Sequence, residues 1–248
     1  MTGGAVVEVY PDPEALAQAV AERFVARAVE AVAARGRFAV ALAGGTTPRA
    51  AYALLALPHY AARVDWARVH VFWGDERCVP PEHPDSNYRM ARQALLEHVP
   101  IPLENVHRLR GELDPRQAAD ACERELRSFF AGGPPAFDLV LLGLGRDGHT
   151  ASLFPGAAAP GETGRWAVAE YVEALGAWRL TLTPVLFNAA AEVIFMVSGA
   201  DKAERLRQVI VGPYQPQRLP AQAIRPVQGN LRWLVDAAAA GWLVESAF

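Results

Sequence analysis

Apolar residues follow two alternating spacings along the chain, one typical of helices and the other of buried strands. Between residues 13 and 35 they recur every three or four positions, which predicts a long amphipathic helix. Asp12 is its expected N-cap, Pro13 stands in its first turn and Gly36 lies just past its end. Residues 38–43 form instead a short, unbroken apolar run before two glycines, which predicts a strand buried on both faces.

This alternation of strand and helix continues through the rest of the chain. Further strands are expected at 69–73, 138–142 and 193–197, with shorter candidates at 166–172, 179–183 and 231–235. Further helices are expected after Thr47 as cap, over 86–98 and 115–130, from Pro184, and over 202–211, whereas the segment 212–226, rich in Pro and Gln, is expected to be a surface connection. We therefore predict an α/β fold, an open, mostly parallel twisted sheet with helices on both faces, in one domain spanning residues 1–248.

Composition and charge narrow the possible functions. The chain is 52% hydrophobic and 21% charged, as in an ordinary globular protein. Its formal net charge is −3 and it has no basic run, which argues against a nucleic-acid partner. No apolar stretch reaches the roughly 18 residues of a membrane span, and the first residues lack the features of a secretory signal. Cys78 and Cys122 lie far apart, which argues against a disulfide framework or a zinc site and favours a cytoplasmic location.

Candidate chemistry is expected beyond the carboxyl ends of the strands, where open α/β sheets bind their ligands. The first such place is the turn formed by Gly44, Gly45, Thr46 and Thr47. Its glycines let the backbone approach a ligand, and the helix that follows offers unpaired N–H groups. The turn is therefore a candidate phosphate seat, although an ordinary tight strand-to-helix turn has the same composition.

Charged residues follow two other strands. Arg77 has the planar guanidinium that suits a phosphate or carboxylate, and Asp75 is placed to accept from a sugar hydroxyl or to orient a neighbour. The alternative is an exposed ion pair at a loop tip. Lys202 is expected in the first turn of a helix, where a cation opposes the helix dipole, and this position suggests a bound anion that offsets the repulsion. The alternative, a solvated surface lysine, is the commoner case for any single lysine.

A glycine-rich loop follows the strand predicted at 138–142. Its sequence matches the Gly-x-Gly-x-x-Gly pattern of dinucleotide sites, but Pro155 limits any helix after Gly148 to about one turn, so we reject that interpretation. The loop presents Asp147 and His149 together, and an imidazole is the usual general base near neutral pH. A lone histidine is more often structural, but this one follows a buried strand directly and has a carboxylate two positions away.

Together these segments resemble the glucosamine-6-phosphate isomerase/6-phosphogluconolactonase family, and in particular its lactonases. The resemblance covers most of the chain in the right order and rests on Ala-Gly-Gly-Thr-Thr-Pro at 43–48, Trp-Gly-Asp-Glu-Arg-Cys-Val-Pro at 73–80, Asp-Ser-Asn-Tyr at 85–88, Gly-Leu-Gly-Arg-Asp-Gly-His-Thr-Ala-Ser-Leu-Phe-Pro at 143–155 and Ser-Gly-Ala-Asp-Lys-Ala at 198–203. It implies hydrolysis of 6-phospho-D-glucono-1,5-lactone, the second step of the pentose phosphate pathway, without metal or organic cofactor. The partner it implies is this small sugar-phosphate lactone, and we expect a monomer or small homo-oligomer.

The resemblance also implies roles for individual residues. His149 would be the base. Our own mechanistic hypothesis is that His149 activates water for attack on C1, that Asp147 fixes the imidazole ring or a substrate hydroxyl, and that backbone N–H groups of residues 145–148 stabilise the oxyanion. Arg77, Lys202 and the turn at Gly45 and Thr46 would hold the 6-phosphate. The full set expected to bind substrate is Gly44, Gly45, Thr46, Thr47, Asp75, Arg77, Gly145, Gly148, Arg179 and Lys202.

The chain departs from the family pattern in one segment. Residues 173–178 replace a Pro-Lys-Pro-Pro stretch that family members often carry, so a substrate contact from this segment is in doubt. Arg179 matches a basic position, and it is open whether this arginine contacts ligand or a carboxylate of its own chain.

Two other functions fit the same resemblance less well. In the related glucosamine-6-phosphate deaminase, Asp-Gly-His is followed by a glutamate in Phe-Asn-Glu-Pro, whereas here no carboxylate follows until Glu162. A non-catalytic sugar-phosphate sensor of the kind found in regulators would carry a DNA-binding segment, and neither end of this chain has a spare basic domain. A hydrolase that needs a single base is therefore favoured.

Overall fold

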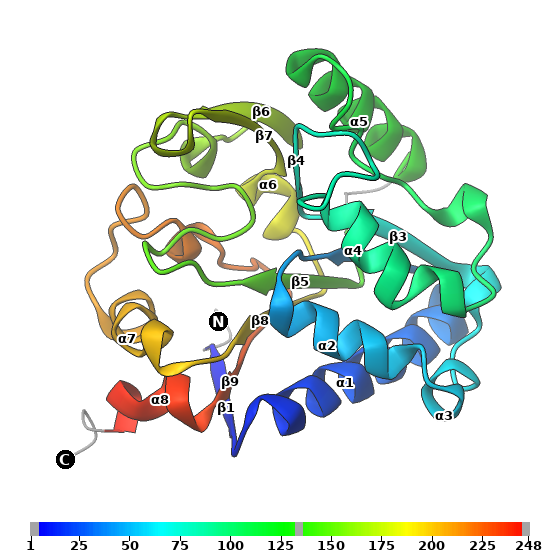
Figure 1. Ribbon diagram of the computed structural model, residues 1–248, viewed down its shortest axis with the longest axis horizontal. Coiled ribbons are helices and arrows are strands. Elements are labelled where there is room, and N and C mark those ends of the chain that lie inside the picture. The colour runs from blue at the N-terminus through cyan, green and yellow to red at the C-terminus, as the bar shows by residue number, and fades with distance from the viewer. Residues whose placement is uncertain (1–4, 132–135, 245–248) are drawn as a thin grey trace.

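A parallel sheet forms the centre of the computed structural model, which describes residues 5–131 and 136–244 (Figure 1). Six strands in the described residues make up this sheet, in the order β1-β9-β8-β5-β2-β3. They are β1 (Val6–Tyr10), β2 (Phe38–Leu42), β3 (Val69–Trp73), β5 (Leu139–Gly143), β8 (Glu192–Val197) and β9 (Asn230–Asp236). Every neighbouring pair in this sheet runs parallel, which confirms the α/β class predicted from the alternation of strands and helices.

Helices cover both faces of the sheet, because each central strand carries apolar side chains on both sides. The helices are α1 (Pro13–Arg35), α2 (Thr46–Leu55), α3 (Pro58–Ala61), α4 (Asn87–Ala94), α5 (Pro115–Phe129), α6 (Pro184–Phe187), α7 (Ala203–Val211) and α8 (Ala237–Val244). In β2, Val40 and Leu42 pack into the core that contains α1 and α2, while Ala39 and Ala41 pack into the core of α6, α7 and α8. The run of residues 38–43 is apolar without a break because both faces of the strand are buried.

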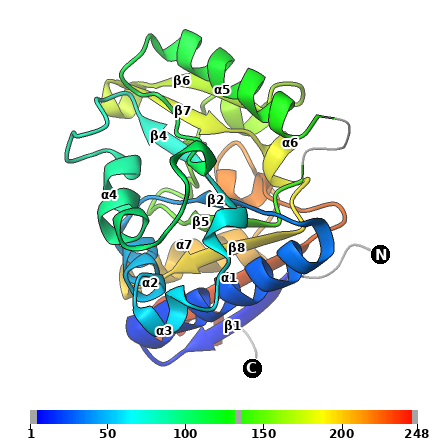
Figure 2. The same cartoon turned by 90° about the vertical axis from the view of Figure 1, so that its right-hand side faces the viewer.

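A second, antiparallel sheet consists of β4 (Asp75–Arg77), β7 (Ala177–Leu182) and β6 (Ala167–Val172), in the order β4-β7-β6. Both ribbon views place it next to α5, at the end of the molecule opposite β1 (Figures 1 and 2). It is tied to the large sheet at Gly74, whose N–H donates to Leu42 at 2.8 Å and whose carbonyl accepts from the N–H of Leu182 at 2.8 Å. The charged segment at 75–77, for which an exposed loop tip was the alternative interpretation, is a short strand.

Several predicted boundaries were wrong. The predicted cap Thr47 lies inside α2, which begins at Thr46 after Gly45, because the φ of +108° at Gly45 makes the turn. The helix predicted over 86–98 ends at Ala94, where Leu95 breaks it with φ −139° and ψ −60° before a separate 3-10 turn. Lys202 closes a 3-10 turn and is the N-cap of α7 rather than part of its first turn.

Three further segments differ from the expectation. Strand β1 and helix α8 were missed altogether. The segment at 212–226 is only partly a surface connection, because residues 219–224 are buried around a 3-10 turn at Pro220–Ala223. These buried residues pack into the same core as α7 and α8.

Candidate active site

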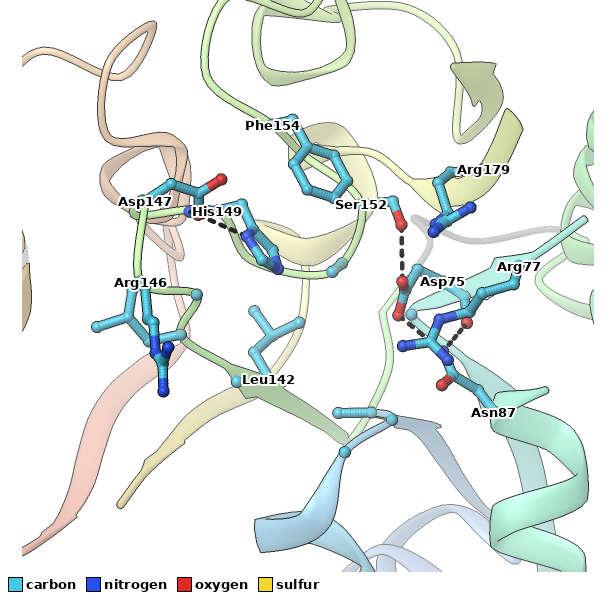
Figure 3. A pocket seen from close by; sticks show the side chains of 18 of the residues that line it. Asp75, Arg77, Asn87, Leu142, Arg146, Asp147, His149, Ser152, Phe154 and Arg179 are labelled. Carbon is cyan, nitrogen blue, oxygen red and sulfur yellow. Dashed lines mark hydrogen bonds and ion pairs between the residues drawn. The ribbon is translucent and has the colours of Figure 1, made fainter. Parts of the chain in front are cut away.

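A cavity of about 640 Å³ opens at the carboxyl ends of β2, β3 and β5, against the small sheet (Figure 3). This is the position at which open α/β sheets bind ligands. Its lining includes most of the residues predicted to bind or react, namely Gly44, Gly45, Asp75, Arg77, Gly145, Asp147, His149, Arg179 and Lys202. Thr46, Thr47 and Gly148 were predicted with them but are not among the lining residues.

The base loop, residues 144–155, brings Asp147 and His149 together on one side of the cavity. Asp147 Oδ1 lies 2.6 Å from His149 Nδ1 and accepts the backbone N–H of His149 at 3.0 Å. Because a carboxylate only accepts, Nδ1 carries the proton of the neutral ring and Nε2 is left as the acceptor. Figure 3 shows the ring extending from the loop above Leu142, with Phe154 over it. The two ring centroids are 4.5 Å apart, so the imidazole is held from two directions.

The charge state of Asp147 follows from this geometry. Burial by itself raises the pKa of this carboxyl group, but the hydrogen bonds from the ring and backbone of His149 outweigh it and lower the pKa to about 2. Asp147 is therefore ionised throughout the neutral range. A fixed negative charge beside Nδ1 orients the imidazole.

Glycines in the base loop serve the loop itself. A Cβ at Gly145 would lie 2.1 Å from His149 Nδ1, so only glycine leaves room for the ring. Gly148 has a φ of +90° and packs against Leu219 instead of facing the cavity, which corrects its prediction as a substrate-binding residue. The N–H groups of Gly145 and Gly148 already donate to His149 O and Gly145 O, so they are not the free oxyanion donors expected.

The arginine pair, Arg77 on β4 and Arg179 on β7, stands on the other side of the cavity (Figure 3). The two residues are direct partners in the antiparallel ladder. Arg77 donates to the carbonyl of Asp85, and Arg179 donates to the carbonyl of Trp178 at 3.0 Å. None of the ion pairs in the described part of the chain includes either arginine. Burial, together with the charge of Arg77, lowers the pKa of Arg179.

Like charges directly opposite one another destabilise a strand pair unless something neutralises them. Among the described residues neither arginine forms an ion pair, although the charges of Asp75 and Asp85 act on Arg179. Arg179 faces the cavity, so a contact with a ligand stays a prediction for this side chain.

Asp75 is a buried carboxylate between these two sides. Its oxygens accept from Ser152 Oγ at 2.7 Å and from Asn87 Nδ2 at 3.2 Å (Figure 3). Asn87 also packs against the turn after β2, where a Cβ on Gly44 would lie 1.9 Å from Asn87 Oδ1. Sequence reasoning missed Asn87 and Ser152 as individual residues, although both lie in the segments that carry the family resemblance.

Glu76 holds β4 to the start of α4. This buried carboxylate accepts the N–H groups of Arg77, Asn87 and Tyr88, each at 2.8 Å, and the hydroxyl of Ser86 at 3.0 Å. Burial raises the pKa of Glu76. All of these donors belong to segments around the cavity, so Glu76 fixes the backbone on which Asp75 and Arg77 stand.

A second group of cations lies near the start of α7. Lys202 lines the cavity, and its Nζ is 3.9 Å from Asp201 Oδ2, which also pairs with Arg146 Nε at 2.7 Å. Unlike the arginine pair, these cations share a carboxylate.

The turn into α2 has no side-chain cap, so its first N–H groups are not satisfied by a capping side chain.

Two other features, a metal-binding cluster and a membrane-spanning helix, are absent from the described residues. No group of three or more His, Cys, Asp or Glu side chains there is placed to hold a metal ion. Among the same residues no helix is both long and apolar enough to cross a membrane.

Comparisons with known proteins agree with this geometry. Residues 11–233 match the family model described as glucosamine-6-phosphate isomerases/6-phosphogluconolactonase. The chain is 46% identical over 214 residues to a 6-phosphogluconolactonase from Synechocystis sp., covering 85% of this chain and 86% of the relative. The structure matches a 6-phosphogluconolactonase from Trypanosoma brucei with a TM-score of 0.84 and 30% identity, covering 96% of this chain and 98% of the other. A monomeric glucosamine-6-phosphate deaminase matches with a TM-score of 0.80 but 20% identity over 96% of this chain and 99% of the other, which shows a shared fold alone.

Proposed function

This chain belongs to the glucosamine-6-phosphate isomerase/6-phosphogluconolactonase family, and from that premise we propose how its cavity acts on a phosphorylated lactone. Its reaction is the hydrolysis of 6-phosphogluconolactone, a step of the pentose phosphate pathway. The observation that carries the proposed mechanism is the Asp147–His149 contact of 2.6 Å on a cavity that also holds an unneutralised arginine pair. One side supplies a base, and the other supplies charge for an anion.

His149 acts as the general base. Its Nε2 takes a proton from water while the water oxygen bonds to C1 of the lactone, and Asp147 stabilises the imidazolium that forms. The tetrahedral intermediate then collapses as the bond between C1 and the ring oxygen breaks. The imidazolium returns its proton to that oxygen, which becomes a hydroxyl group, and the product leaves as the open-chain acid. A lactone is an activated ester, so this step needs no covalent nucleophile.

The 6-phosphate is held by cations that line the same cavity. We assign this contact to Arg77, Arg179 and Lys202, together with backbone N–H groups of the turn at Gly45 and Thr46. A guanidinium donates two parallel hydrogen bonds to a phosphate, and the start of a helix favours an anion. Asp75, as an acceptor on the cavity wall, is placed to bind a sugar hydroxyl.

A direct test compares three substrates. Release of 6-phosphogluconate from the phosphorylated lactone is coupled to 6-phosphogluconate dehydrogenase, plain gluconolactone is assayed beside it, and ammonia release is followed with glucosamine 6-phosphate. We expect fast hydrolysis of the phosphorylated lactone, a lower kcat/KM for the plain lactone and no ammonia. Equal kcat/KM for both lactones would contradict the phosphate contacts, and ammonia release would favour the deaminase.

The deaminase is the less favoured alternative because of the surroundings of His149. Among the described residues, Asp147 is the one carboxylate hydrogen-bonded to its ring, and Phe154 stacks on the ring face. No second carboxylate is therefore in place to partner the imidazole.

The working unit is proposed to be a monomer or small homo-oligomer in the cytoplasm. A cavity whose described lining comes from one chain needs no residue from a partner to bring base and cations together. Cys78 and Cys122 are both free, which suits a reducing compartment. Size-exclusion chromatography with light scattering measures the oligomeric state, and a mass far above a few subunits would contradict it.

A further inference from the structure

Ser152 connects the two sides of the cavity. It is buried in the base loop, three residues after His149, and its hydroxyl donates to Asp75 Oδ2 at 2.7 Å. Asp75 stands on β4, two residues before Arg77. The backbone N–H of Ser152 also donates to Thr181 Oγ1 at 3.4 Å, and Thr181 stands on β7, two residues after Arg179. One residue of the base loop therefore reaches both strands that carry the arginine pair, and Figure 3 shows its bond to Asp75.

No other residue of the base loop makes this connection. Among the hydrogen bonds between described residues, those of Ser152 are the ones that join residues 144–155 to β4 and β7. The other hydrogen bonds of the loop stay within it, join it to its chain neighbours Gly143 and Ala157, or run toward Asp201, Arg205 and Ala221, on the side of α7 and its following segment. Without Ser152, the base loop and the small sheet would be connected only by side-chain packing and through the large sheet that both adjoin.

From this connection we infer that Ser152 is a positioning residue that sets the span between the imidazole of His149 and the arginine pair. The inference rests on the proposed function, in which the substrate is anchored by its phosphate on one side and attacked on the other. A lactone held by its phosphate presents its carbonyl carbon to His149 correctly only if the arginine pair and His149 keep a fixed separation. An error of about 1 Å in such a separation costs on the order of 100-fold in rate.

The fold itself does not depend on this connection. Asp75 keeps its hydrogen bond from Asn87 Nδ2 at 3.2 Å, and Asn87 also donates to the carbonyl of Asp75 at 3.0 Å. The small sheet keeps its two bonds to the large sheet at Gly74. Removing the hydroxyl of Ser152 therefore loosens the relation between the two sides while each side remains formed.

The substrate pair separates positioning from a general loss of structure. In Ser152→Ala, kcat for the phosphorylated lactone is expected to fall about 10- to 100-fold, with a much smaller change in KM. Plain gluconolactone has no phosphate to be anchored, so its kcat/KM should change little. The preference of the enzyme for the phosphorylated substrate therefore falls.

Two further variants make the test specific. Ser152→Cys keeps the size of the side chain but donates weakly, so it should lie between wild type and Ser152→Ala; it also replaces Ser152→Ala as the test if the latter does not fold. Thr183→Val is the matched control, since the Thr183 hydroxyl is buried and donates to the carbonyl of Arg165 at 2.6 Å, away from the cavity. This control should lose thermal stability but keep its preference between the lactones.

The outcomes distinguish this inference from the proposed function. If wild type prefers the phosphorylated lactone and folded Ser152→Ala keeps the whole preference, or loses activity equally on both lactones, Ser152 is not a positioning residue. If wild type itself shows no preference, the phosphate contacts of the proposed function fail first. A loss confined to the phosphorylated lactone, graded from Ser152→Cys to Ser152→Ala, supports the inference.

Discussion

The base loop and the arginine pair face the same cavity but balance their charges in opposite ways. In the base loop, the carboxylate of Asp147 lies 2.6 Å from the imidazole of His149, only two residues along the chain. In the arginine pair, Arg77 and Arg179 oppose each other across a ladder and donate to backbone carbonyls. The base loop is thus held together by a contact within itself, whereas the arginine pair has no ion-pair partner among the described residues and is suited to bind an anion. Chemistry and substrate binding are therefore assigned to separate structural units, which separate substitutions can disturb.

The largest effect should come from removing the base. His149→Ala is expected to lower kcat by about 10²–10⁴-fold, the usual contribution of a general base, while KM changes little because the arginine pair is intact. Steady-state kinetics with the phosphorylated lactone checks this. Full activity in His149→Ala would show that His149 is not the general base. The contrast between the base loop and the arginine pair would then not hold.

Neutralising the arginine pair should produce the converse pattern. Arg77→Ala and Arg179→Ala each remove a charged hydrogen-bond donor, so kcat/KM for the phosphorylated lactone should fall about 10- to 100-fold, mainly through KM. Plain gluconolactone should be nearly unaffected. Arg68→Ala, at an exposed arginine outside the cavity lining, is the control. An equal loss on both lactones would mean that the arginines support the structure rather than bind phosphate.

A smaller effect is expected from crowding the imidazole without removing it. Gly145→Ala would place a methyl group 2.1 Å from His149 Nδ1, so the ring or the loop must shift, and kcat should fall about tenfold. The matched control is Gly241→Ala in α8, where a Cβ meets nothing within 4 Å. Unchanged kcat in Gly145→Ala would show that the position of the ring is less critical than the contact with Asp147 suggests.

The smallest effect concerns pH and stability. Because the folded protein lowers the pKa of Asp147 to about 2, this group contributes stability that is present above about pH 4 and is lost as the pH falls toward 2. The group is half exposed, so the contribution is about 1 kcal/mol or less. The free energy of unfolding, measured in urea from pH 5 to pH 2.5, should depend less on pH in Asp147→Asn than in wild type. If it falls equally with pH in both proteins, the carboxylate is not held by His149.

The spacing of apolar residues predicted every strand of the large sheet except β1, and the local sequence also predicted the base loop. Strands that form only by pairing with a distant segment were not predicted. Strands such as β2 are buried on both faces, so they are apolar at every position and visible in isolation. Strand β4 is three charged residues long and exists because β7 pairs with it, about 100 residues later. Nothing near residue 75 in the chain signals that partner.

The residues of the site that could be predicted from the sequence are those whose type and neighbours indicate a single role. Asp147 and His149 were visible because a carboxylate and an imidazole share a short glycine-rich loop. A glycine, however, can be needed either for contact with a ligand or for a backbone turn, and the sequence does not distinguish the two. Gly148 is needed for the backbone. Ser152 and Asn87 were indistinguishable from ordinary polar residues because their common partner, Asp75, is distant in the sequence from Ser152.

The pairing of β1 with β9 has a consequence for synthesis of the protein on the ribosome. Val6 lies opposite Arg232, and Arg232 forms ion pairs with Glu8 and Glu192, so the first strand finds its neighbour only when residues 230–236 have emerged. Until then β8 is left as an unprotected edge and β1 has no place in the sheet. Completion of the large sheet therefore waits for residues 230–236, and a nascent chain stalled before residue 230 is the form most exposed to aggregation and to chaperones.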